Sequence, residues 1–296
     1  MKPLIIGSRG SPLALAQVTL IKSLLPGVPV ETVIIKTSGD KFLEVSLAAA
    51  GGKGLFTKEI EDQLLAGTIQ VAIHSLKDLP TDLPAGLTLA AVPTREDARD
   101  VFVSRRYSSL DELPTGAHIA TSSIRRKAQL LARRPDLKIS EIRGNVATRL
   151  QKLTEFDGTL LAAAGLKRLG LWQNVTGYWW QLLDIETMIP AVGQGIIGCE
   201  ICQADTATRQ VLDQFNDADT LACATAERAF LKTIGGGCQF PYAGHATITG
   251  NQLKLVAGVF SPDGRKAKRI EVTGTKSEAF ALGEQAAQAL RPALHL

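Results

Sequence analysis

The first 190 residues alternate short apolar segments with amphipathic ones, and this alternation constrains the fold more than any other feature of the chain. The short segments, rich in β-branched and other apolar residues, predict strands, and the longer segments between them have helical periodicity. Strands are predicted for 4–7, 30–36, 69–75, 117–121, 138–142 and 158–164, and helices for 12–25, 57–65, 122–134 and 146–153. Such alternation is typical of open, mostly parallel α/β sheets, and here it predicts two of them.

After about residue 217 the pattern changes to closely spaced strands between two helices. Turn signals separate the three predicted strands from one another. The strands are predicted for 243–249, 253–260 and 269–273, and the helices for 222–234 and 277–290. We therefore expect a third domain of the α+β class with an antiparallel sheet.

Composition excludes several classes of protein. With 45% apolar and 21% charged residues, the chain is neither disordered nor fibrous. No apolar run approaches the ~20 residues that span a bilayer. The Gly-Ser-Arg turn at residues 7–9 comes too early for the apolar core of a signal peptide. We expect a cytoplasmic protein, from a bacterial cytosol or, after removal of a transit peptide, from a plastid stroma.

Cys199 and Cys202 form a C-x-x-C pair, which invites a redox or a zinc interpretation. A redox pair normally lies where a helix begins, whereas this pair lies in the apolar, strand-like run GIIGCEIC. A zinc site needs two more ligands, and the four histidines are widely scattered. We interpret both residues as cysteines of a buried strand.

Basic residues are concentrated in the middle of the chain. Residues 121–149 contain eight Lys and Arg and two acidic residues, so this segment carries +6 whereas the rest of the chain sums to −2. A local cationic surface in a nearly neutral protein indicates a discrete polyanionic ligand. RNA is an alternative ligand, but base stacking would need aromatic residues among the arginines, and there are none between Tyr107 and Phe156.

Polar side chains follow the predicted strands at their carboxyl ends, where open α/β sheets bind ligands. These residues are Arg9, Ser11, Lys77, Asp78, Ser122, Ser123, Arg125, Arg143 and Arg168. Two lobes whose strand ends face each other would form a polar cleft, and because guanidinium groups bind carboxylates bidentately, we expect a ligand with several carboxylates. Phosphate is an alternative, but the glycine-rich stretch 51–54 lacks a Ser or Thr after Lys53.

Asp78 and Cys238 are the two residues with potential for chemistry beyond ion pairing. Asp78 is the only carboxylate among the strand-end residues, so it could stabilise a developing positive charge or move a proton; alternatively it caps a turn before Leu79-Pro80. Cys238 follows three glycines, which would expose its thiol as a nucleophile or an attachment point; alternatively it is a small residue in a tight loop.

Eleven sequence strings occur in the order and spacing of one enzyme family. They are GSRGSPLALAQ, GGKGLFTKEIE, AIHSLKDLP, TREDARDVFVS, ATSSIRRKAQL, RRPDLKI, IRGNVATRL, AAAGLKRLGL, PAVGQG, TAERAFL and GGCQ. On these strings, from about residue 5 to 258, the chain resembles the hydroxymethylbilane synthase (porphobilinogen deaminase) family. The resemblance implies a transferase of tetrapyrrole and porphyrin biosynthesis. Such enzymes condense four porphobilinogen molecules head to tail onto a covalent dipyrromethane cofactor, lose four ammonia, and release hydroxymethylbilane by hydrolysis.

The resemblance also implies roles for individual residues. Asp78 in HSLKDLP matches the catalytic carboxylate, and Cys238 in GGCQ matches the cysteine that binds the dipyrromethane through a thioether. The residues expected to bind the cofactor with it are Ser75, Lys77, Thr121, Ser122, Ser123, Arg125, Arg126, Arg143, Gly144 and Gln194. Those expected to bind the substrate are Arg9, Ser11, Lys53, Phe56, Arg149 and Arg168. No metal is implied.

The fold that the resemblance implies has three domains. Two are α/β lobes like those of periplasmic binding proteins, with open mixed sheets, and the third is a smaller α+β domain with a three-stranded antiparallel sheet. The expected boundaries are 1–93 with 196–213, 99–189, and 218–296, with hinges near 93–98 and 190–195. We expect a monomer that binds porphobilinogen and neither nucleic acid nor a membrane. A non-catalytic receptor for a polyanion, built on the same two lobes, is the rival, but it would need neither Asp78 nor Cys238.

Overall fold

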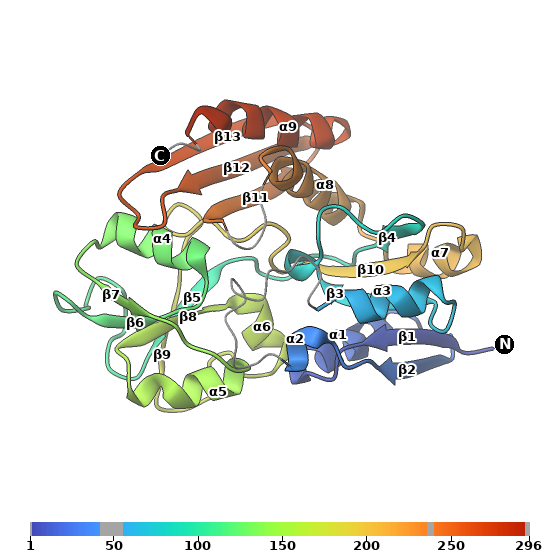
Figure 1. The fold of residues 1–296 in the computed structure, drawn as a ribbon, viewed down its shortest axis with the longest axis horizontal. Coiled ribbons are helices and arrows are strands. Elements are labelled where there is room, and N and C mark those ends of the chain that lie inside the picture. Colours follow the sequence, from blue (N-terminus) through green and yellow to red (C-terminus); the bar gives the residue numbers. More distant parts are fainter. Residues whose placement is uncertain (1, 42–55, 236–239, 294–296) are drawn as a thin grey trace. The chain divides into compact units, whose positions relative to one another are not determined.

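The computed structural model describes residues 2–41, 56–235 and 240–293, and in them the chain forms three sheets (Figure 1). Two sheets have five strands and mixed direction, and the third has three antiparallel strands. The expectation of two α/β lobes with open mixed sheets and a smaller α+β part is therefore confirmed. No described helix is both long and apolar enough to cross a membrane.

The first sheet has the strand order β2-β1-β3-β10-β4. Its strands are β1 (Leu4–Ser8), β2 (Val30–Ile34), β3 (Val71–Ser75), β4 (Leu87–Ala91) and β10 (Ile197–Cys202). The strand β1 runs parallel to β2 and β3, whereas β10 returns from far along the sequence and runs antiparallel between β3 and β4. The late segment thus completes the middle of the first sheet.

Apolar clusters cover both faces of this sheet, one containing Ile6 and Ile73 and the other Ile60 and Leu64. Among the helices that supply these contacts, α1 begins at a capping residue: Ser11 Oγ accepts the Ala14 N–H at 3.3 Å, and Pro12 follows it. The helical elements are α1 (Pro12–Ser23), α2 (Ser38–Lys41), α3 (Lys58–Leu65), η1 (Leu76–Asp78), α7 (Thr206–Leu212) and η3 (Asp213–Phe215).

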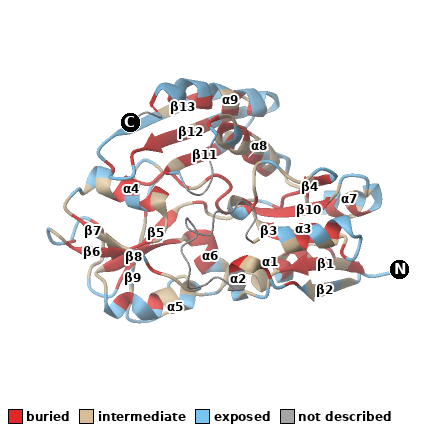
Figure 2. Ribbon diagram, viewed as in Figure 1, coloured by how far each residue is buried: buried red, intermediate tan, exposed pale blue. Residues whose placement is uncertain are grey.

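The second sheet has the strand order β7-β6-β8-β5-β9, with Phe102 and Leu160 buried on one face and Val101 and Leu161 on the other. Figure 2 shows that burial concentrates on its central strands. Its strands are β5 (Asp100–Ser104), β6 (His118–Ala120), β7 (Lys138–Ser140), β8 (Gly158–Ala162) and β9 (Trp179–Leu182). Its helical elements are α4 (Ile124–Arg133), α5 (Val146–Gln151), η2 (Lys152–Thr154) and α6 (Ala163–Arg168).

The third sheet consists of β11 (Tyr242–Thr249), β12 (Gln252–Phe260) and β13 (Ala267–Thr275), paired in sequence order. Side chains of the sheet and of two helices, among them Phe230 and Leu255, form one buried cluster. The helical elements are α8 (Ala218–Thr233), η4 (Lys276–Glu278), α9 (Ala279–Leu290) and η5 (Arg291–Ala293).

By its contacts the chain divides into two compact units, which we call unit 1 (residues 1–96 and 196–221) and unit 2 (97–195 and 222–296). Unit 1 contains the first sheet, and unit 2 contains the second and third sheets. Within unit 2 a small cluster of Ala128, Ile189, Ala243 and Phe260 packs α4 against the third sheet.

Most of the predicted elements are present, and the differences have local causes. Strands β4, β5 and β9 were not predicted: β5 begins with a charged residue, and β9 carries two tryptophans beside polar neighbours. Arg168 was expected at a strand-to-helix turn, but α6 begins directly after β8, so Arg168 lies in its last turn.

The interpretation of the C-x-x-C pair as strand cysteines is confirmed, because Cys199 and Cys202 both lie in β10. Cys199 packs in one apolar cluster of the first sheet and Cys202 against the other, so the two thiols point to opposite faces. Burial raises the pKa of the Cys199 thiol, which keeps it protonated. The pair therefore lacks the geometry of a redox site, and the Cys199 thiol lacks its ionisation.

Candidate active site

Asp78 lies just after the carboxyl end of β3, in the one-turn 3-10 helix η1. Leu76 and Leu79 are buried on either side of it, and Leu76 N donates to Ile196 O at 3.0 Å. With both neighbouring leucines anchored, Lys77 is half-buried and Asp78 is exposed. The turn thus presents a carboxylate at the strand end that open α/β sheets use for ligands.

Other predicted site residues of unit 1 lie at the same sheet edge, because β1 and β3 are parallel neighbours. Ser75 ends β3, and its hydroxyl accepts a hydrogen bond from Gln17 Nε2 of α1 at 2.7 Å. Arg9 follows β1, and its guanidinium carbon lies 4.2 Å from the centre of the Phe56 ring. Ser11 is occupied as the N-cap of α1.

Strand β3 is also joined to β10 by a buried hydrogen bond between side chains. His74 Nε2 lies 3.1 Å from Glu200 Oε2, and both side chains are almost completely buried. A second buried carboxylate, that of Glu61 in α3, interacts electrostatically with both groups. Burial raises the pKa of Glu61, and the charge of Glu200 raises it further.

In unit 2, the hydroxyl residues between β6 and α4 bind the backbone around them. Ser123 caps α4 by accepting the Arg126 N–H, and Thr121 Oγ1 accepts the Ser123 N–H at 3.2 Å. Ser122 Oγ donates to Ile142 O at 2.7 Å and accepts the Ile142 N–H at 3.1 Å. These bonds join the carboxyl ends of β6 and β7 and fix the first turn of α4.

Arg125 and Arg126, in that first turn, share one buried carboxylate on β5. Arg125 Nη2 donates to Asp100 Oδ2 at 2.8 Å, and Arg126 Nη2 donates to Asp100 Oδ1 at 2.8 Å. Both arginines are 6% exposed and Asp100 is fully buried. Burial alone would raise the pKa of Asp100, but the charges of the two arginines hold it well below its usual range.

Gln194 completes this group. Its side-chain amide donates to Asp100 Oδ1 at 2.9 Å and to Ala98 O at 2.7 Å. The same segment is bound by two arginines: Ile189 O accepts from Arg125 at 2.7 Å, and Gly195 O accepts from Arg168 at 2.6 Å. Predicted ligand residues from distant parts of the sequence thus meet around residues 189–195.

Arg143 precedes α5, and Arg149 lies in its last turn. Arg143 pairs with Glu141 at 2.9 Å, and this pair is partly exposed. Arg149 Nε donates to Gly144 O at 2.9 Å. Burial lowers the pKa of Arg149, and the charge of Arg126 lowers it further, which places the two guanidinium groups within electrostatic reach. The positive charge of Arg149 therefore adds to that of the buried pair.

The sequence analysis did not identify Asp100. A charged residue at the start of the apolar run DVFVS was the available signal, because a carboxylate in a buried strand needs cationic partners. Two predicted residues, Lys53 and Cys238, lie outside the described residues.

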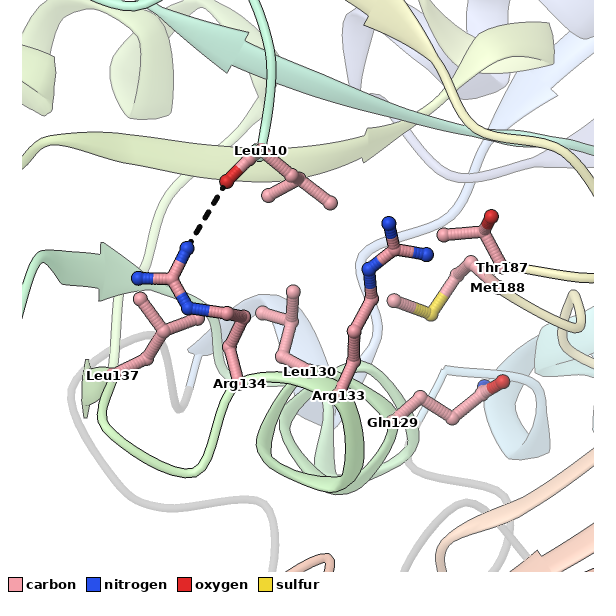
Figure 3. A pocket seen from close by; sticks show the side chains of 8 residues that line it. All are labelled: Leu110, Gln129, Leu130, Arg133, Arg134, Leu137, Thr187 and Met188. Carbon is pink, nitrogen blue, oxygen red and sulfur yellow. Dashed lines mark hydrogen bonds between the residues drawn. The ribbon is translucent and has the colours of Figure 1, made fainter. Parts of the chain in front are cut away.

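Unit 2 also contains a small pocket (Figure 3). It is bordered by the last turns of α4, where Arg134 Nη1 donates to Leu110 O at 3.4 Å. None of the residues that line it was predicted to bind a ligand: Leu110, Gln129, Leu130, Arg133, Arg134, Leu137, Thr187 and Met188.

Comparison with known protein families gives two adjoining matches. The family model described as "Porphobilinogen deaminase, dipyromethane cofactor binding domain" matches residues 4–210, and "Porphobilinogen deaminase, C-terminal domain" matches residues 221–292. Together the two models cover nearly the whole chain.

Curated relatives match at close to half identity. The porphobilinogen deaminase of Trichlorobacter lovleyi is 50% identical, over 98% of this chain and 93% of its own. That of Geobacillus kaustophilus is 48% identical, over 98% of this chain and 94% of its own. Among solved structures, the effector-binding domain of BenM is 13% identical with a TM-score of 0.43, and it covers 72% of this chain and 90% of its own. At that TM-score the likeness carries no weight, and the strand order defines the fold.

Proposed function

Since this chain belongs to the porphobilinogen deaminase family, it is a hydroxymethylbilane synthase of tetrapyrrole biosynthesis that uses a dipyrromethane cofactor, and we propose which of its residues perform each part of that reaction. Each pyrrole of the substrate and the cofactor carries an acetate and a propionate. The protein must therefore bind a chain that becomes more negative as it grows.

The residues around α4 and α5 suit such a polycarboxylate. Arg125, Arg126 and Arg149 contribute three guanidinium groups. Arg125 and Arg126 bind one carboxylate, that of Asp100, and Arg149 donates to a neutral backbone carbonyl, Gly144 O. Incompletely neutralised cations that are largely withdrawn from water favour anionic ligands strongly. This excess of buried positive charge is the observation that carries the proposal for the cofactor site.

When bound, the dipyrromethane supplies the growing pyrrole chain, and Cys238 is the residue proposed to anchor it. The remaining proposed ligands are those expected from the sequence: Ser75, Lys77, Thr121, Ser122, Ser123, Arg143, Gly144 and Gln194 toward the cofactor, and Arg9, Ser11, Lys53, Phe56 and Arg168 toward the substrate. Arg9 against the Phe56 ring combines a cation for a carboxylate with an aromatic face for a pyrrole.

We propose that Asp78 is the catalytic carboxylate. Loss of ammonia from porphobilinogen leaves a cation whose charge extends onto the pyrrole nitrogen. An exposed carboxylate on a rigid turn can accept a hydrogen bond from that N–H and stabilise the charge as it develops. The buried anchors Leu76 and Leu79 keep this carboxylate in place, so little reorganisation is needed during the reaction.

Three further proposals concern the whole protein. We propose three domains with the boundaries 1–93 with 196–213, 99–189, and 218–296, with hinges near 93–98 and 190–195. We propose a monomer. We also propose a cytosolic location.

The intact mass of the denatured protein tests the cofactor assignment. Protein made with porphobilinogen available should exceed its polypeptide mass by two linked pyrrole units. A Cys238→Ser variant, made in the same way, should have the bare polypeptide mass, whereas a Cys202→Ser control should keep the excess. An excess that persists in Cys238→Ser would reject this cysteine as the anchor, and no excess after incubation with porphobilinogen would reject the proposed cofactor site.

A further inference from the structure

The carboxylate of Asp100 is the centre of a buried hydrogen-bond network in unit 2. Its Oδ1 accepts from Arg126 Nε at 3.2 Å, from Arg126 Nη2 at 2.8 Å and from Gln194 Nε2 at 2.9 Å, while Oδ2 accepts from Arg125 Nη2 at 2.8 Å. Four donors on three side chains therefore converge on one carboxylate.

The other partners of the two arginines are neutral. Arg125 Nη1 donates to Ile189 O at 2.7 Å, and Arg126 Nη1 donates to Leu160 O at 2.7 Å. Carbonyl groups satisfy N–H donors but do not cancel a full charge. Asp100 is thus the group that offsets the repulsion between two adjacent buried guanidinium ions, and the trio retains one positive charge.

These bonds also leave donors for a ligand. A guanidinium group has five N–H donors, of which the network uses two on Arg125 and three on Arg126. The side chains are therefore fixed in direction without being saturated. An incoming carboxylate would meet oriented donors and a net positive charge.

We propose that Asp100 is a positioning residue for the cofactor: an internal anion that holds Arg125 and Arg126 in binding geometry before the dipyrromethane is attached. This inference rests on the proposed function of the two arginines. It goes beyond that function because it predicts that Asp100 contributes more to stability in the apoprotein than in the holoprotein. Once the cofactor carboxylates are bound, they neutralise part of the charge of the arginines. The stability of the protein then depends less on Asp100.

The test compares Asp100→Asn with wild type in two forms of the full-length chain. The apoprotein is made in cells that lack porphobilinogen, and the holoprotein is made with porphobilinogen supplied. Removing one member of a buried ion pair from a protein of this size should lower the Tm of the apoprotein by roughly 10 °C. We expect less than half of that loss in the holoprotein. Wild-type apoprotein should also gain the mass of two pyrrole units from porphobilinogen ~10-fold faster than Asp100→Asn, as expected for a lost hydrogen-bonded charge.

Asp136→Asn is the matched control. Asp136 accepts two hydrogen bonds from Arg134, at 2.8 and 2.9 Å, and lies just beyond the other end of α4. The substitution is chemically identical, but the residue is outside the proposed cofactor site. Its effect on Tm should be the same in the apoprotein and the holoprotein, and its rate of cofactor acquisition should equal that of wild type.

Equal losses of Tm in the two forms of Asp100→Asn would overturn the proposal and leave Asp100 as an ordinary structural ion pair. If Asp100→Asn does not fold without cofactor, Asp100→Glu is tested in its place, because a glutamate keeps the negative charge at a slightly displaced position. Asp100→Glu should still lose more Tm as the apoprotein, and equal losses would again overturn the proposal. If wild-type protein gains no pyrrole mass at all, the proposed cofactor site itself is wrong, and this result is distinct from a failure of the Asp100 inference.

Discussion

Individual side chains in this protein acquire their chemical character from one or two buried neighbours. Leu76 and Leu79 anchor the turn that exposes Asp78, and Asp100 sets the direction of Arg125 and Arg126. In both cases the residue proposed to meet the ligand is exposed or incompletely paired, while the residue that positions it is buried. Replacing one or the other should therefore separate effects on activity from effects on stability.

Asp78→Asn should abolish nearly all turnover and leave the fold intact. Amide for carboxylate removes the negative charge that stabilises the developing cation, for which we expect a loss of at least ~10²-fold in kcat. Because the Asp78 side chain is exposed, the Tm of the variant should differ little from that of wild type. Asp82→Asn, an exposed carboxylate shortly after it, serves as the control in the same assay of porphobilinogen consumption. Turnover within a factor of ~10 of wild type for Asp78→Asn would contradict its assigned role.

Glu61 should make stability depend on pH. Because burial raises its pKa, the folded protein binds the proton more tightly than the unfolded chain does. This contribution to stability is complete below the ordinary carboxyl pKa of 4.5 and is lost as the pH rises through the higher folded pKa. Glu61→Gln, which stays neutral, should show a smaller fall in Tm over that range than wild type. Parallel curves of Tm against pH for the two proteins would show that Glu61 does not titrate in this way.

At the level of elements, α4 is positioned from two sides. Its first turn is fixed by Ser123 and by the pairing with β5, and the turn between β12 and β13 packs against its middle. At Gly264 in that turn, φ is +73°, and a Cβ atom would lie 2.5 Å from Ala132 N of α4. Only glycine fits both the backbone conformation and the close approach. The third sheet thus helps to place the helix that carries Arg125 and Arg126.

Gly264→Ala should therefore destabilise the protein and slow cofactor acquisition. We expect a loss of ~3 kcal/mol in the free energy of unfolding, from left-handed strain together with the clash against α4. Gly250→Ala is the control, since Gly250 lies in the other hairpin turn with φ of +63° and has nothing within 4 Å of its Cβ position. It should cost ~1 kcal/mol through strain alone. Urea unfolding and mass measurement would check both variants, and equal losses would disprove the contact with α4.

The molecule as a whole divides into two compact units, and the proposed chemistry is divided between them. Unit 1 carries Asp78, and unit 2 carries the buried arginines that we assign to the cofactor. Segments 189–195 and 92–95 run up to the boundaries between the units, and both are well bonded: Gln194 binds Asp100, and Arg95 N donates to Thr220 Oγ1 at 3.0 Å.

The protein should be a monomer in solution. The large apolar side chains that are exposed in the described chain lie on separate elements instead of forming one stripe: Ile34, Leu65, Trp179, Phe240 and Phe280. Light scattering after size exclusion should give a mass near 31.6 kDa at micromolar concentration. A concentration-independent mass of twice that value would contradict this prediction.

The sequence by itself determined the alternation of strands and helices and the membership of the family, because these depend on local periodicity and on strings of consecutive residues. It also placed Asp78 at a strand end. Only the tertiary structure decided that β10 runs antiparallel between β3 and β4 and that Asp100 neutralises the arginines of α4. Strand order and the burial of a charge depend on which distant segments pack together, and the free energy of that packing is not written in any local pattern.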